Sequence, residues 1–144
     1  MNSHSPQFFM SEALRLAEKA LFTTSPNPRV GCVIVQNNEI VGRGYHVKAG
    51  ESHAEVIALK EAGSKSEGSD VYVTLEPCTM CAGAMLHARV ERVVFGATDP
   101  KTGAAGSVLN VFSEKQINHQ TQVEGGIMGE ECGQVLRDFF KERR

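Results

Sequence analysis

Residues 70–88, DVYVTLEPCTMCAGAMLHA, join an apolar run rich in β-branched residues to a Cys-x-x-Cys motif and then to a helix-forming run. The composition of Asp70 to Leu75 is typical of a strand. Proline is tolerated in the first turn of a helix, so Pro77 predicts a helix that begins there and continues to about Ala88. A strand that leads directly into a helix is the repeating unit of α/β proteins.

The rest of the chain alternates between the same two kinds of element. The Ser-x-x-Glu pattern from Ser52 to Glu55 has the form of a capping box and predicts a helix that ends near Gly63. Apolar residues at helical spacing predict further helices over about residues 9–22 and 130–144. Strands are expected at residues 30–35 and 40–45, joined as a hairpin, at residues 92–95 and, weakly, at residues 122–123. This order predicts an α/β fold, a three-layer α/β/α sandwich with a mixed central sheet.

Size and composition restrict the class of protein. A chain of 144 residues has room for one domain, so residues 1–144 are expected to form a single unit. With 41% hydrophobic and 22% charged residues, and no apolar run near the ~20 residues that span a bilayer, a soluble globular protein is expected. The net charge of -2 excludes a global positive field, so a polyanion must bind at a local patch. The polar N-terminal residues do not resemble a signal peptide, and a cytoplasmic location is expected.

The Cys-x-x-Cys motif and an upstream His-x-Glu predict a metal site. Cys78 and Cys81 are three residues apart on a predicted first turn, where the positive helix end favours thiolates. His53, at the start of a neighbouring predicted helix, is expected to be a third zinc ligand. Three protein ligands with a fourth position for water are the catalytic arrangement of zinc. Glu55 is expected to stand beside that water without binding the metal.

Each of these residues also has a simpler interpretation. A Cys-x-x-Cys motif that opens a helix after a strand is equally typical of a thioredoxin-like redox pair. A structural zinc site would need a fourth protein ligand, for which Cys32 and Cys132 are the candidates, although both are expected in the core. Glu55 alone would be read as the capping-box glutamate. The combination matches the zinc-deaminase signature His-x-Glu…Pro-Cys-x-x-Cys and favours a hydrolytic enzyme.

The signature also predicts the chemistry. Zinc lowers the pKa of a bound water from about 15.7 to about 7, so hydroxide is available at neutral pH. Glu55 would then carry a proton from the water to the ring nitrogen beside the attacked carbon, and later help to protonate the departing ammonia. The expected reaction is hydrolysis of a ring amidine to a carbonyl.

At these residues the chain resembles the cytidine-deaminase superfamily, over nearly its whole length from about Phe9, and within the superfamily it resembles two families. The deaminase domain of the bifunctional riboflavin-biosynthesis protein is similar to residues 23–35 (TTSPNPRVGCVIV), 42–46 (GRGYH) and 48–56 (KAGESHAEV). Bacterial tRNA adenosine deaminase is similar to residues 75–89 (LEPCTMCAGAMLHAR), 92–97 (RVVFGA), 101–107 (KTGAAGS) and 138–144 (DFFKERR).

Both family patterns are interrupted in this chain. Riboflavin deaminases place several residues between the two ligand cysteines, whereas only Thr79 and Met80 separate them here. The tRNA deaminases carry Val-Pro-Val-Gly where this chain has residues 27–31, NPRVG, and asparagine where it has His46. We infer a hybrid of the two families that is joined within residues 72–77. The resemblance implies conversion of adenosine to inosine at the tRNA wobble position. The alternatives are deamination of the diaminohydroxyphosphoribosylaminopyrimidine intermediate of riboflavin biosynthesis, and a zinc-stabilised RNA-binding module with weak catalysis.

The resemblance also implies substrate-binding residues and partners. It assigns substrate contacts to Asn27, His46 and Asp99, and a tRNA-loop contact to Asn118. At the C-terminus it implies RNA contacts by Phe140 and Arg143, because cations beside aromatic rings suit single-stranded RNA loops. The expected partner is a tRNA anticodon loop, or a small pyrimidine nucleotide, and the superfamily implies a homodimer packed through the helices that follow the zinc motifs.

Overall fold

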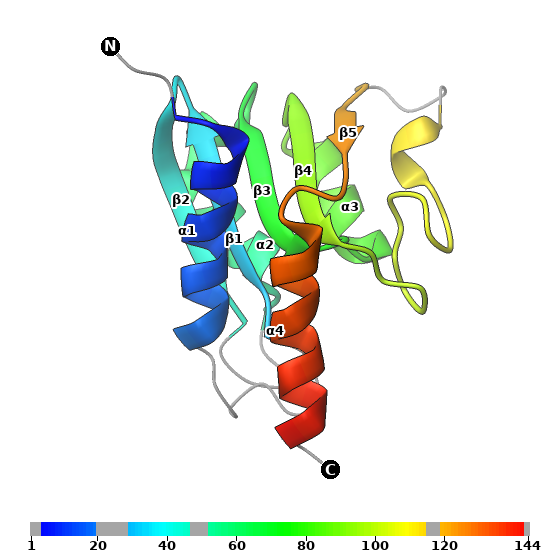
Figure 1. Ribbon diagram of the computed structural model, residues 1–144. Helices are drawn as coiled ribbons and strands as arrows, with labels where there is room; N and C mark the ends of the chain where they lie inside the picture. Colours follow the sequence, from blue (N-terminus) through cyan, green and yellow to red (C-terminus); the bar gives the residue numbers. More distant parts are fainter. Residues whose placement is uncertain (1–3, 20–28, 47–51, 115–118, 143–144) are drawn as a thin grey trace.

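The computed structural model describes residues 4–19, 29–46, 52–114 and 119–142, with side chains as far as residue 138. One mixed sheet of five strands, in the order β2-β1-β3-β4-β5, forms its centre (Figure 1). The strands are β1 (Gly31–Gln36), β2 (Glu39–Tyr45), β3 (Asp70–Leu75), β4 (Arg92–Ala97) and β5 (Gln122–Glu124). The predicted strands are therefore confirmed, including the weak one near residue 122.

Strand direction determines where the chemistry-bearing residues gather. Strand β1 is antiparallel to both β2 and β3, whereas β3 and β4, and β4 and β5, are parallel. Strands β2, β3, β4 and β5 consequently run in the same direction, and their carboxyl ends lie along one edge of the sheet. In open α/β sheets ligands bind outside the carboxyl ends of the strands.

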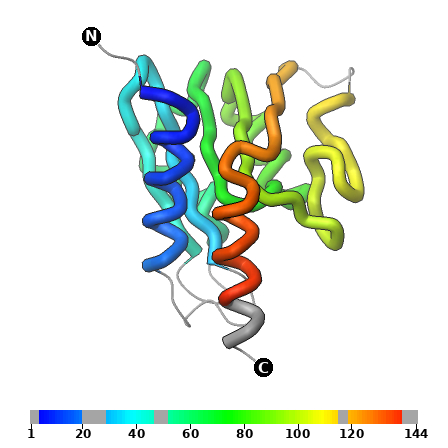
Figure 2. Tube along the Cα trace, in the orientation of Figure 1, coloured from blue at the N-terminus to red at the C-terminus, as the bar shows by residue number. Residues whose placement is uncertain are grey.

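The helices cover both faces of the sheet. Figure 1 shows α1 (Pro6–Lys19) and α4 (Gly129–Glu142) side by side on one face, and Figure 2 shows the same arrangement along the Cα trace. Helices α2 (Ala54–Ala62) and α3 (Thr79–His87) pack on the other face. Each face has its own apolar core: Phe9, Tyr72 and Val94 belong to one, and Ala58 and Met85 to the other. The predicted three-layer α/β/α sandwich is confirmed.

Turns and short helices complete the chain. Asn37 and Asn38 join β1 to β2 with φ values of 52° and 64°, as tight hairpins require. Gly63 ends α2 with a φ of 57°, where a side chain would be strained. Two 3₁₀ helices that the sequence did not predict are η1 (Gly63–Ser66) and η2 (Val111–Ser113). Within the described residues, no helix is both long and apolar enough to cross a membrane.

Three predicted helix starts differ from the structure. Helix α1 begins at Pro6, three residues before its predicted start near residue 9. Helix α2 begins at Ala54 with His53 as its N-cap, and no side chain caps it, so Ser52 and Glu55 do not form a capping box. The reason is burial: Glu55 is only 4% exposed and lines the pocket beside His53. Helix α3 begins at Thr79 with Cys78 as its N-cap, so Pro77 precedes the helix and does not occupy its first turn.

Close packing positions α2 on the sheet. A Cβ atom on Gly44 of β2 would overlap the carbonyl oxygen of Ala54, and one on Gly42 would overlap that of Ala58. Because these two strand positions lack side chains, the helix backbone approaches the sheet closely. His53 and Glu55 are thereby held against the carboxyl end of β2.

Replacing Gly44 by alanine should therefore destabilise the protein by about 1–3 kcal/mol, because the added methyl group meets backbone that cannot move freely. The free energy of unfolding in urea measures this effect. Gly83→Ala is the matched control: Gly83 is an exposed position in α3 with nothing within 4 Å of the added Cβ. The control should stabilise the helix by about 0.5–1 kcal/mol. Equal effects of the two substitutions would contradict close packing as the cause.

Candidate active site

Three potential metal donors meet where α2 and α3 begin. His53 Nδ1 lies 3.4 Å from Cys81 Sγ and 3.8 Å from Cys78 Sγ, and the three donor atoms lie within 4.8 Å of one another. His53 and Cys78 are N-cap residues, and Cys81 lies in the first turn of α3. Cys81 is fully buried, whereas His53 and Cys78 are half-buried. The structure thus brings together the three residues predicted as ligands.

The geometry of this cluster fits zinc. Tetrahedral zinc with bonds of ~2.0–2.1 Å to nitrogen and ~2.3 Å to sulfur separates a nitrogen donor from a sulfur donor by about 3.6 Å. The observed nitrogen to sulfur distances, 3.4 and 3.8 Å, lie on either side of this value. Among the described residues, the cluster holds only these three His, Cys, Asp or Glu side chains. Three donors leave one tetrahedral position open, as in catalytic zinc sites.

The other two cysteines lie in the apolar cores, as the sequence predicts. Cys32 on β1 is fully buried in the core beneath α2 and α3. Cys132 on α4 is buried on the opposite face of the sheet. Burial raises the pKa of both thiols, to about 12 for Cys132. Neither belongs to the metal cluster, and among the described residues no fourth protein donor joins His53, Cys78 and Cys81.

The two clustered thiols differ in acidity. The pKa of Cys78 is lowered to about 5, chiefly because the Cys81 thiol hydrogen-bonds to it, with further help from the Cys81 backbone and from His53. The pKa of Cys81 is raised by that same hydrogen bond and by burial. Cys78 is therefore the thiol that ionises first. Thiolates are the form that binds metal.

Glu55 lies beside the cluster but outside it. Its carboxyl group is buried in the first turn of α2 and lines the pocket next to His53. Burial raises the pKa of Glu55 to about 7. A carboxyl group with a pKa near neutrality can both accept and donate a proton, which is the property of a general acid and base.

The cluster opens into a pocket of about 250 Å³ at the carboxyl-end edge of the sheet. This volume lies near the lower end of the ~300–1,000 Å³ range of ligand pockets, which suits a single ring system. Its walls come from the residue before β1, the end of β3, the residues that follow β2, β3 and β4, and the start of α2. They are Val30, His46, His53, Ala54, Glu55, Leu75, Glu76, Cys78, Asp99 and Thr102.

Two predicted substrate-binding residues lie in this pocket. His46 follows β2, is 3% exposed, and its Nδ1 lies 3.1 Å from the carbonyl oxygen of Ser52. Its ring is edge-on to the His53 ring, with 5.6 Å between centroids. Asp99 follows β4, and its carboxylate accepts hydrogen bonds from the Lys101 backbone and from the backbone and hydroxyl of Thr102. Asp99 thus stabilises a turn as well as lining the pocket.

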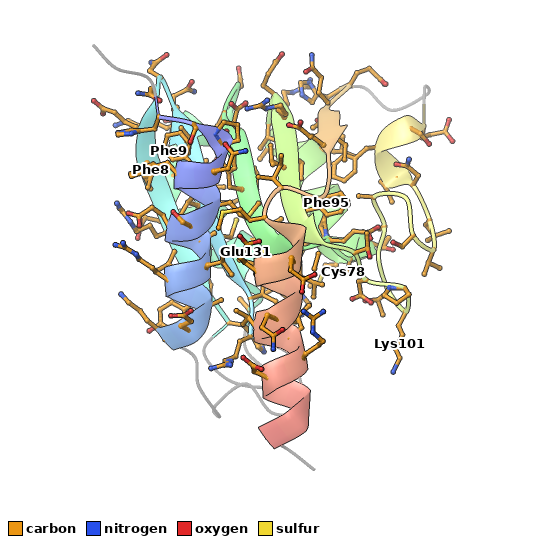
Figure 3. The ribbon with its side chains drawn as sticks, viewed as in Figure 1. Phe8, Phe9, Cys78, Phe95, Lys101 and Glu131 are labelled. Carbon is orange, nitrogen blue, oxygen red and sulfur yellow. The ribbon has the colours of Figure 1, made fainter. Side chains whose placement is uncertain are left out.

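The other residues predicted to contact the substrate or RNA have side chains outside the described part of the chain. Asn27, Asn118 and Arg143 lie outside the described residues, and Phe140 lies in α4 with its side chain outside them. Arg137, on the described part of α4, is paired with Glu130 at 2.9 Å. Lys101, on the loop after β4, points away from the sheet (Figure 3).

Glu76 is a pocket residue that the sequence analysis missed. It follows β3, is 3% exposed, and accepts hydrogen bonds from groups of residues 99–107. Burial raises the pKa of this carboxyl group, but the hydrogen bonds outweigh burial and its pKa lies below the usual value. The available signal was an acidic residue between the apolar Leu75 and Pro77, at the carboxyl end of a predicted strand.

Comparison with known proteins identifies the class. The family model of the cytidine and deoxycytidylate deaminase zinc-binding region matches residues 3–97. The tRNA-specific adenosine deaminase of Bacillus subtilis is 42% identical, over 96% of this chain and 90% of its own length. The riboflavin biosynthesis protein RibD of Escherichia coli is 45% identical, over 96% of this chain and 38% of its own length.

Solved structures of a RibD protein and of a tRNA deaminase also resemble this chain. The structure of Acinetobacter baumannii RibD superposes with a TM-score of 0.81 at 39% identity, covering 94% of this chain and 39% of that protein. A structure from a study of A-to-I editing by tRNA:A34 deaminases gives a TM-score of 0.78 at 34% identity, covering 90% of this chain and 99% of that one. The chain therefore spans less than half the length of the RibD proteins that it matches.

This chain belongs to the cytidine and deoxycytidylate deaminase family. It is a zinc-dependent hydrolytic deaminase by class, and its His-Cys-Cys cluster suits the metal. Family membership decides between the zinc and the thioredoxin-like interpretations of Cys78 and Cys81 in favour of zinc. Relatives of both kinds match 96% of the chain, so the hybrid origin stays a prediction.

Proposed function

We propose that residues 1–144 form a single deaminase domain that converts adenosine to inosine at the wobble position of tRNA. His53, Cys78 and Cys81 bind zinc, and Glu55 moves protons. When bound, zinc supplies a Lewis acid that lowers the pKa of a coordinated water from about 15.7 to about 7. His46 and Asp99, which line the pocket, would hold the base beside the metal donors.

Glu55 performs the proton transfers of this reaction. Its carboxylate takes a proton from the attacking water and passes it to the ring nitrogen next to the carbon under attack. A second proton from the water, again carried by Glu55, reaches the departing amino group. The C–NH2 bond breaks, a carbonyl forms, and one water is consumed for each ammonia released. The buried position of Glu55 keeps this carboxyl group away from bulk water.

The observation that carries the choice of substrate is the spacing of the cysteines. Cys78 is the N-cap of α3 and Cys81 lies in the first turn, so only Thr79 and Met80 separate the two thiols. This compact arrangement is the pattern of the tRNA deaminases that the C-terminal half resembles, whereas riboflavin deaminases place several residues there. The B. subtilis tRNA deaminase, 42% identical, supports the same substrate.

The second candidate is the pyrimidine intermediate of riboflavin biosynthesis. A specific observation favours it: His46, which resembles a substrate-binding residue of riboflavin deaminases, is buried in the pocket wall. The 45% identity with the E. coli RibD protein supports it as well. A catalytically weak RNA-binding module is the third candidate.

Partners and location follow from the same proposal. A tRNA anticodon loop would contact the pocket rim and the basic, aromatic C-terminal residues. A homodimer is expected through α2 and α3, the helices that follow the zinc motifs, and Met80 at the start of α3 is 60% exposed. The expected compartment is the cytoplasm, where tRNA is modified.

An ammonia-release panel tests the substrate. The purified protein is incubated with an anticodon stem-loop that carries adenosine at the wobble position, with the riboflavin pyrimidine, with cytosine and with guanine. We expect ammonia and inosine from the stem-loop alone. A stem-loop with guanosine at the wobble position is the matched control. Turnover of the pyrimidine without turnover of the stem-loop would make the second candidate correct. Stem-loop binding without ammonia release would favour the RNA-binding module.

A further inference from the structure

Glu76 is a buried carboxylate whose hydrogen-bonding capacity is filled by one loop. Its Oε1 accepts hydrogen bonds from the Asp99 backbone N–H, at 3.0 Å, and from the Ser107 hydroxyl. Its Oε2 accepts from the backbone N–H groups of Ala105, at 2.9 Å, and Ser107, at 3.0 Å. All four donors are neutral groups of residues 98–107, the segment that we call the rim loop.

The rim loop is built closely around this side chain. A Cβ atom on Gly103 would overlap the carboxyl group of Glu76, so the loop backbone passes directly against it. The backbone N–H of Ala104 donates to the carbonyl oxygen of Pro77 at 2.8 Å, which adds a second attachment to the same segment. The rim loop is thus anchored to the residues that immediately precede the metal donor Cys78.

This anchor connects the two sides of the pocket. Asp99 and Thr102 belong to the rim loop and line the pocket, whereas Cys78 belongs to the metal cluster on the other side. Glu76 is not a member of that cluster. Glu76 itself lines the pocket, but the four hydrogen bonds described above all join it to the rim loop. The side chain therefore relates the position of the rim loop to the position of the metal donors.

We propose that Glu76 is a positioning residue that holds the rim loop across the pocket and thereby sets the fit of the substrate. This assignment rests on the proposed deaminase function. Replacing Glu76 by glutamine preserves its shape but turns one acceptor oxygen into an N–H donor. In the wild type each carboxylate oxygen accepts hydrogen bonds from two donors. When one oxygen becomes an NH2 group, at least one rim-loop N–H or hydroxyl is left without a partner.

The first test measures the loop directly and needs no substrate. Hydrogen exchange of backbone amides is followed by NMR in the wild type and in Glu76→Gln. We expect the amides that face the new NH2 group, either Asp99 or the pair Ala105 and Ser107, to exchange at least about tenfold faster in the variant, because they lose their buried acceptor. Ser69→Ala is the matched control: it removes a buried hydrogen bond to Ser66 at the other end of β3. In that control these amides should keep their protection.

The second test separates substrate fit from catalysis and metal binding. On whichever panel substrate the wild type deaminates, Glu76→Gln should raise KM by at least about tenfold while kcat changes little and zinc content stays near one per chain. Gly103→Ala should act in the same way, because its methyl group pushes the rim loop off an unchanged Glu76. This second variant carries the test if Glu76→Gln does not fold.

The outcomes separate this inference from the proposed function. Unchanged amide exchange and KM in both variants would overturn the positioning role. So would loss of zinc, which would make Glu76 a support of the metal site, or an equal rise of KM in Ser69→Ala, which would make the effect a matter of general stability. If the wild type deaminates no substrate of the panel, the proposed function fails, while the amide-exchange result still decides the role of Glu76 in the loop.

Discussion

Replacing Glu55 by glutamine should leave the fold and the bound zinc intact and reduce deamination by at least ~10²-fold. The amide has nearly the shape of the carboxyl group but cannot carry a proton. Glu55 is buried in the pocket and lies outside the group of metal donors. The expected loss is therefore one of proton transfer. Steady-state ammonia release, with zinc measured by elemental analysis on the same preparation, gives both quantities.

An exposed glutamate provides the control for this substitution. Glu67 follows η1 and does not line the pocket, so Glu67→Gln should retain full activity. If Glu55→Gln loses its zinc, then Glu55 is a ligand and the proposed division of roles is wrong. If the variant keeps zinc and full activity, another group transfers the proton.

Replacing Cys78 by alanine should remove the bound zinc, whereas the Glu55→Gln variant should keep it. We expect zinc to fall from about one per chain to near zero, and deamination to fall to background, because two remaining donors hold zinc poorly. The thermal unfolding midpoint should also fall, since the bound metal stabilises only the folded chain. Elemental analysis and thermal unfolding, with and without added chelator, measure these effects.

Cys132→Ala is the matched control for the metal site. Cys132 is also buried, but it packs on the opposite face of the sheet, between α4 and β4. Its replacement should cost some stability through lost packing, yet leave zinc content and activity unchanged. Retention of zinc by Cys78→Ala together with its loss from Cys132→Ala would show that the assigned ligands are wrong.

Most of the fold follows from local patterns in the sequence. The β-branched runs predict the strands, the helical spacing of apolar residues predicts α1 and α4, and the start signals at Ser52 and Pro77 predict α2 and α3. All of these signals depend on neighbours only a few residues apart. The starts of α2 and α3 were misplaced by one or two residues, since burial of Glu55 and the extended backbone at Cys78 are decided by tertiary packing.

The candidate site, like the fold, is predicted in part by local sequence signals and in part only by tertiary structure. The spacing of His53, Cys78 and Cys81 on two helix starts is a local signal, and the structure brings these residues together as expected. The association of His46 with Asp99 depends on strand direction, which places the ends of β2 and β4 at one edge. The resemblance to known families, and not residue spacing, predicted that His46 and Asp99 contact the substrate.

Glu76 shows where reasoning from the sequence stops. Its hydrogen-bond donors lie 23 to 31 residues later in the chain, on a loop without regular structure. No periodicity or short motif connects a glutamate with backbone groups at such separations. Its burial between a strand end and a cysteine motif becomes meaningful only once the path of the rim loop is known.

X-ray absorption at the zinc edge of the purified protein tests the central claim, that His53, Cys78 and Cys81 form a catalytic zinc centre. The account predicts one zinc per chain with two sulfur ligands at ~2.3 Å, one imidazole nitrogen at ~2.0–2.1 Å and one further oxygen ligand. Three or four sulfur ligands, which would bring in Cys32 or Cys132, would contradict it, as would a freshly purified chain that holds no zinc and contains a Cys78–Cys81 disulfide.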